Sequence, residues 1–115
     1  MKFKELKFRK LGWGGINATH HFDNGLILSV AAGKTAYCTP REDLNSEKEH
    51  SSFEIAILHK DNIPFFTKLV KPGINDDVIG WVGREDIDEI FPLIDNITED
   101  EISNFIIATN LLGDD

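Results

Sequence analysis

Apolar and polar positions follow strand-like patterns through the first half of the chain. Residues 16–22 and 26–32 are two apolar runs on either side of Asp23-Asn24-Gly25, and Asn-Gly between such runs is the strongest short hairpin signal. The second run is apolar at nearly every position, which predicts a central strand covered on both faces. Alternate positions of the first run share one face, namely Ala18, His20 and Phe22.

Three more segments downstream have the composition of strands. Residues 53–58 place alternate apolar side chains on one face, and residues 63–67 follow as a return strand. Pro64 has no amide donor, so we expect this return strand at a sheet edge, where a second copy of the chain can pair. Residues 78–82 are short and apolar and form a further strand.

The N-terminal segment keeps neither the strand period nor the helix period cleanly. A strand and a short helix both stay open for residues 2–9, and the glycines at 12–15 favour the strand because they stop a helix. Trp13 lies among these glycines. A tryptophan in such a turn either covers the core or serves as an exposed binding anchor, and of the two we favour the cover.

Helical periodicity begins after residue 83. Apolar residues recur at i, i+3, i+4 and i+7 in a helix that starts over residues 84–91, and Pro92 is expected to kink or break it. A capping box at Thr98–Glu101 starts a second helix over residues 98–112. The order of strands and then helices predicts an α+β fold, with a small antiparallel β-sheet of about four to five strands followed by two C-terminal helices.

Length and composition limit the classes of protein to which the chain can belong. A chain of 115 residues is predicted to be a single domain, 1–115, with a mobile charged loop at 39–52. No apolar run approaches the roughly 18 residues of a membrane span, and the N-terminus has no apolar signal region. Cys38 is the single cysteine and cannot form an internal disulfide, which favours a cytoplasmic protein.

The distribution of charge says more than the net charge of −8. Residues 1–11 carry five bases and one acid, whereas residues 76–115 carry twelve acids and only Arg84. This balance argues against direct nucleic-acid binding and favours a partner with a basic surface, although an acidic face also serves solubility alone. The candidate partner-binding residues are Glu85, Asp86, Asp88, Glu89, Glu99, Asp100, Glu101 and Trp13.

Motifs for catalysis or for a cofactor are weak. Gly33-Lys34-Thr35 resembles the end of a phosphate-binding loop, but Leu28 stands where that motif needs a glycine. His20 and His21 are neighbours on a strand and point to opposite faces, so they do not share a metal ion; a site of His20, His59 and an acid stays open. We therefore expect no enzyme, no cofactor and no metal. Should the chain bind a small ligand such as a signal nucleotide, the candidates are Trp13, Lys34, His20 and His21.

The order of several short motifs resembles a small phage-encoded protein family of unknown function. These motifs span roughly residues 12–95 and are Phe22-x-Asn24-Gly25, Ser29-Val30, Tyr37, Phe53-Glu54-Ile55-Ala56-Ile57-Leu58 and Asp77-Val78-Ile79-Gly80-Trp81. The resemblance implies a phage accessory protein in the cytoplasm of an infected cell. Together with the acidic C-terminal third, it favours binding and inhibition of a host protein complex, in defence or nucleic-acid handling. A ligand-sequestering module and a small metal- or His-dependent enzyme are the alternatives.

Overall fold

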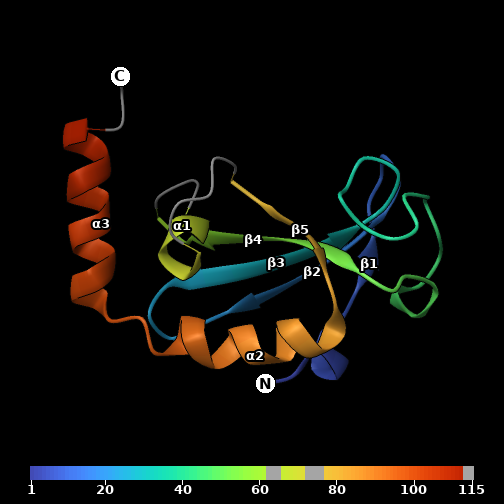
Figure 1. Cartoon of the computed structure of the whole chain (residues 1–115), viewed down its shortest axis with the longest axis horizontal. Coiled ribbons are helices and arrows are strands. Elements are labelled where there is room, and N and C mark those ends of the chain that lie inside the picture. The colour runs from blue at the N-terminus through green and yellow to red at the C-terminus, as the bar shows by residue number, and fades with distance from the viewer. Residues whose placement is uncertain (62–65, 72–76, 113–115) are drawn as a thin grey trace.

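The hairpin around Asn24 organises the fold (Figure 1). The computed structural model describes residues 1–61, 66–71 and 77–112. Strands β2 (Ile16–His21) and β3 (Leu26–Ala32) pair antiparallel, as the Asn-Gly signal predicts. The Asn24 side chain closes the turn, because its Oδ1 accepts a hydrogen bond from the Leu26 amide at 3.0 Å.

The predicted α+β fold is confirmed. Five antiparallel strands form one sheet in the order β1-β2-β3-β4-β5, so each strand pairs with its neighbour in the chain. The remaining strands are β1 (Arg9–Lys10), β4 (Phe53–His59) and β5 (Ile79–Val82). The helices are α1 (Thr67–Val70), α2 (Arg84–Asp95) and α3 (Glu99–Leu112), with 3-10 turns η1 (Phe3–Glu5) and η2 (Glu47–Glu49).

The core lies between one face of the sheet and α2. Alternate residues of β3 and β4 are fully buried on this face, and the α2 stripe of Ile87, Phe91 and Ile94 packs on them. The residues between them, Ile27, Ser29 and Ala31 on β3, are only half-buried. The expectation that this strand is covered on both faces was therefore wrong: β3 is central, but its second face carries small or partly exposed side chains.

Two contacts far apart in sequence fasten α2 to the sheet. Asn24 Nδ2 donates to the carbonyl oxygens of Ile94 and Ile97, each at 2.9 Å. At the other end of the helix, the Asp88 carboxylate accepts from the Phe3 amide at 2.6 Å. The preference for a strand over residues 2–9 was wrong, because the chain forms η1 there and places Phe3 in the core, and only Arg9 of this range belongs to β1.

Other predicted boundaries also shift. Within the predicted strand 63–67, residues 63–65 lie outside the described residues, and Thr67 begins α1. Pro92 does not end α2, which continues to Asp95. The capping box is confirmed, with Thr98 Oγ1 accepting from the Glu101 amide and Glu101 Oε1 accepting from the Thr98 amide.

Helix α3 stands at one end of the molecule (Figure 1). Its first half reaches the core through the buried Ile102 and through Phe105, whose ring centroid lies 5.1 Å from that of Phe66. Ile107 on the same helix is exposed. Among the described residues, no helix is long and apolar enough to span a membrane.

Candidate binding surface around Trp81

A β-bulge in β5 turns Trp81 out of the sheet. Val82 pairs with Phe53 and Ile79 pairs with Ile55, so β5 has one residue more than β4 between the two pairs. Trp81 lies in this bulge with φ 55°, a left-handed backbone conformation that is a genuine outlier for a bulky residue. Its side chain remains 59% exposed. The chain thus holds a large aromatic residue in solvent at a cost in backbone energy, which is typical of functional positions.

Tyr37 packs against the indole of Trp81, and Arg41 in turn packs against Tyr37. The rings of Trp81 and Tyr37 lie 5.2 Å apart between centroids, with 34° between their planes, and the Trp81 amide donates to the Tyr37 carbonyl at 2.9 Å. The Arg41 guanidinium carbon lies 5.2 Å from the Tyr37 ring centroid. A Cβ added to Gly80 would lie only 2.6 Å from Tyr37 Cβ, so this close approach requires a glycine. These contacts fix the orientation of Trp81 before any partner binds.

A groove of about 360 Å³ adjoins Trp81 between α1, β5 and α2. Asp86, Ile90 and Leu93 line its helical side, because residues at i, i+4 and i+7 share one face of α2. Leu93 is 57% exposed there. The other lining residues are Val70, Lys71, Ile79, Gly80 and Val82. The lining is therefore mostly apolar and includes the Trp81 indole, with Lys71 and Asp86 as its charged members.

The rim on the α2 side is acidic. Glu85, Asp86 and Glu89 are exposed on the first two turns of the helix. Arg84 does not neutralise them from solvent, since its guanidinium lies over the rings of Phe3 and Phe53 and donates to the Glu47 carbonyl. Of these acids Asp86 lines the groove itself, and Lys71 lines it as well, so the lining carries one charge of each sign beside exposed aromatic and aliphatic surface, with Glu85 and Glu89 on the adjoining surface of α2.

The predicted acidic set divides into two groups. Glu99, Asp100 and Glu101 begin α3, and the whole length of α2, roughly 18 Å at 1.5 Å per residue, separates them from the group around Glu85 (Figure 1). Two of the seven acids accept hydrogen bonds from backbone amides of the same chain: Asp88 from Phe3, and Glu101 from Thr98 in the capping box. Both groups border a hollow: Asp86 lines the groove beside Trp81, and Glu99 lines a separate pocket of about 300 Å³ with Asn24, His59 and Ile102.

Trp13 does not cover the core. Its side chain is 80% exposed in the turn between β1 and β2, so the preference for a cover was wrong. Lys34 is also exposed and follows β3 at the same end of the sheet. His20 and His21 lie at the opposite end of β2, about five residues of extended chain away. The structure thus brings together two of the four predicted ligand-binding residues.

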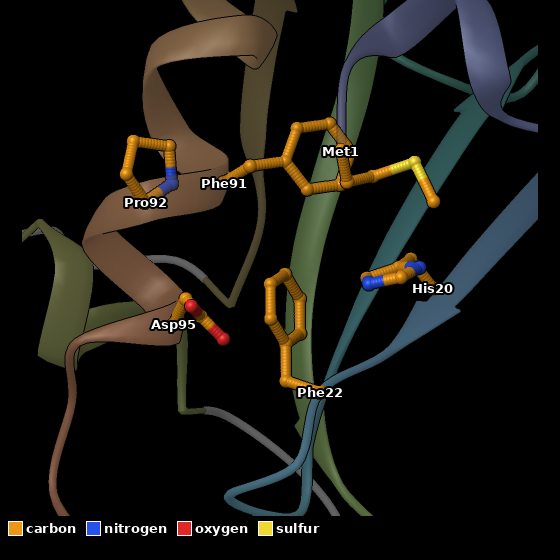
Figure 2. A pocket seen from close by; sticks show the side chains of 6 residues that line it. All are labelled: Met1, His20, Phe22, Phe91, Pro92 and Asp95. Carbon is orange, nitrogen blue, oxygen red and sulfur yellow. The ribbon is translucent and has the colours of Figure 1, made fainter.

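His20 instead lines a separate pocket of about 310 Å³ (Figure 2). Its ring meets Phe22 edge-on, with centroids 4.7 Å apart, and Phe91 at 5.7 Å. Figure 2 shows Asp95 across the pocket from the imidazole, with Met1 and Pro92 at the margin. His21 is exposed and belongs to the other face of the sheet.

The described residues do not form a metal-binding cluster. They contain no group of three His, Cys, Asp or Glu side chains placed to hold a metal ion. His20 and His59 are on the same face but on strands β2 and β4, with β3 between them. Cys38 is buried, and its thiol contacts the backbone of Gly33 and Pro40 at 3.3 Å, which makes it a packing residue.

The sequence predicts the acids of α2 as partner-binding residues but not Trp81, Tyr37 or the groove. It places Gly80-Trp81 in a short apolar strand and in the family pattern, and Tyr37 only in the family pattern. The available signal was a glycine beside a tryptophan in a strand, which is typical of a bulge. In comparisons with protein-family models, curated proteins and solved structures, no match to this chain was found, so the phage-family resemblance stays an expectation.

Proposed function

We propose that this chain is a binding protein and not an enzyme, and that it engages a protein partner through the groove beside Trp81. The observation that carries the proposal is the exposed indole held in a left-handed bulge. Exposed tryptophans beside apolar pockets are the residues that dominate binding energy at interfaces. Tyr37 and Gly80 preorganise the indole, which reduces the entropy lost on association.

The acidic side chains of α2 beside the groove indicate what kind of partner surface would bind there. Glu85, Asp86 and Glu89 favour a partner that places an apolar side chain in the groove and lysine or arginine against α2. Such exposed charges accelerate encounter and lose strength as salt screens them. The resemblance to a phage-encoded family adds the expectation that the partner is a host complex of defence or nucleic-acid handling and that binding inhibits it.

Affinity capture from host lysate with matched variants tests the proposal. Trp81→Gly removes the anchor and suits the left-handed backbone, whereas Trp13→Ala removes the other exposed tryptophan as a control. The double reversal Glu85→Lys with Glu89→Lys is compared with the double reversal Glu99→Lys with Asp100→Lys, which changes the charge equally at the start of α3.

We expect one salt-sensitive partner that is lost with Trp81→Gly and with the α2 reversal but retained by both controls. With that partner purified, Trp81→Gly should weaken binding at least 30-fold, the equivalent of a hot-spot loss of about 2 kcal/mol. A partner retained by Trp81→Gly would refute the groove. A partner lost only with the α3 reversal would move the contact to the acids of that helix.

A further inference from the structure

Two loops that are distant in sequence enclose the carboxylate of Asp43. Its Oδ1 accepts a hydrogen bond from the Lys34 amide at 2.8 Å. A Cβ added to Gly14 would lie 2.6 Å from Oδ2, and one added to Gly33 would lie 3.0 Å from Oδ1. The carboxylate therefore rests against bare backbone from the β1–β2 turn and from the segment after β3.

This arrangement depends on glycine at both loops. Gly14 has φ 102° and Gly33 has φ 158°, which L side chains rarely adopt. The loops also touch each other, because a Cβ on Gly33 would lie 2.8 Å from the Cα of Gly15. The Lys34 amide supplies the hydrogen bond, whereas the amides of Gly14 and Gly33 donate to the Leu11 carbonyl and the Cys38 sulfur, so the two glycines contribute space for the anion and no donors. Backbone concavities that direct amides at an anion bind small oxyanions in proteins.

The surroundings of this cradle suit a phosphate-bearing ligand. Trp13, the most exposed large apolar side chain of the described residues, directly precedes Gly14. Basic residues neighbour the cradle in the chain although the net charge of the protein is −8; they are Arg9, Lys10, Lys34 and Arg41. Exposed aromatic side chains stack on nucleobases, and lysine and arginine side chains nearby attract phosphate groups.

We propose that Gly14, Gly33 and the Lys34 amide form an anion-binding site that Asp43 occupies as an intramolecular ligand. A nucleotide displaces this carboxylate by placing its phosphate in the cradle and its base on Trp13. Asp43 is itself exposed, so a ligand reaches the cradle without disturbing the core. The proposal does not depend on the groove beside Trp81, since the cradle and the groove have no lining residue in common.

Chemical rescue of Asp43→Ala tests the cradle. Glu42→Ala is the matched control, because it removes one exposed acid from the adjacent position. We expect inorganic phosphate to raise the Tm of Asp43→Ala by about 5 °C at ten times its Kd, and further with the logarithm of its concentration, above a chloride reference of equal ionic strength. Wild type and Glu42→Ala should respond with at least tenfold weaker apparent affinity. An equal response of the three proteins would refute the site.

Adenosine 5′-monophosphate tests the role of Trp13. In the Asp43→Ala protein we expect it to bind at least fivefold more tightly than inorganic phosphate and to quench tryptophan fluorescence. Adding Trp13→Ala should abolish the quenching and return the affinity to that of phosphate, whereas adding Trp81→Gly should leave the affinity unchanged. Equal affinities of phosphate and nucleotide in the presence of Trp13 would overturn the nucleotide assignment.

Discussion

Replacing Trp81 by glycine and by alanine separates backbone strain from side-chain contact. Both variants lose the ring contact with Tyr37, a loss of about 0.5–1.5 kcal/mol that is common to the two. They differ in the backbone energy at φ 55°, because this conformation destabilises an L-residue by about 1–2 kcal/mol and does not destabilise glycine. Glycine loses about 0.5–1 kcal/mol through its greater freedom in the unfolded chain. Trp81→Gly should therefore be the more stable variant by about 0.5–1 kcal/mol.

The assay is urea and thermal unfolding of the two variants side by side. For a chain of this length the expected difference corresponds to roughly 3 °C in Tm. Ala56→Gly on the neighbouring strand β4 is the control, because alanine is favoured over glycine by about 0.5–1 kcal/mol in a strand interior. If Trp81→Ala equals or exceeds Trp81→Gly in stability, the backbone at position 81 is not strained, and strain no longer supports a binding function for Trp81.

Three further substitutions test the packing. Gly80→Ala forces a Cβ within 2.6 Å of Tyr37 Cβ and should destabilise the protein by about 1–3 kcal/mol, while near-ultraviolet circular dichroism reports a displaced Tyr37–Trp81 pair; an unchanged spectrum would contradict this. Asn24→Ala removes three hydrogen bonds and should cost about 2–4 kcal/mol in urea unfolding, against less than 1 kcal/mol for the exposed neighbour Asp23→Ala. His50 is 2% exposed, and neither ring nitrogen has a hydrogen-bond partner in the part of the chain that the structure describes, so His50→Leu should stabilise by about 1–2 kcal/mol, seen as a higher urea midpoint at constant m; a lower midpoint would reveal a partner for the imidazole.

Local signals predicted the elements whose causes lie within a few residues. The hairpin depends on Asn24 and Gly25, and the start of α3 depends on Thr98 and Glu101. The apolar stripe of α2 could also be recognised from its spacing alone. In each case the residues that determine the conformation are neighbours in the sequence, so the pattern and its cause are visible together.

The candidate surface has causes that are distant in sequence. The bulge at Trp81 arises from the register of β5 on β4, and the support of its indole comes from Tyr37, more than forty residues earlier. Likewise η1 forms where the Asp88 carboxylate accepts a hydrogen bond from the Phe3 amide, 85 residues away in the sequence. Single-residue periodicity carries no information on such pairings, which is why the acidic α2 residues were recognised while the groove beside them was not.

The contacts of Asn24 and Phe3 with α2 imply an order of events during synthesis. The sheet residues are complete once β5 has been made at Val82, yet their apolar face has no cover until α2 follows. The carbonyl of Ile97 is the last acceptor that the Asn24 side chain needs. A nascent chain that ends near residue 82 should therefore resist neither proteases nor aggregation, whereas one that has released residue 97 from the ribosome should close around Asn24, with α3 added last.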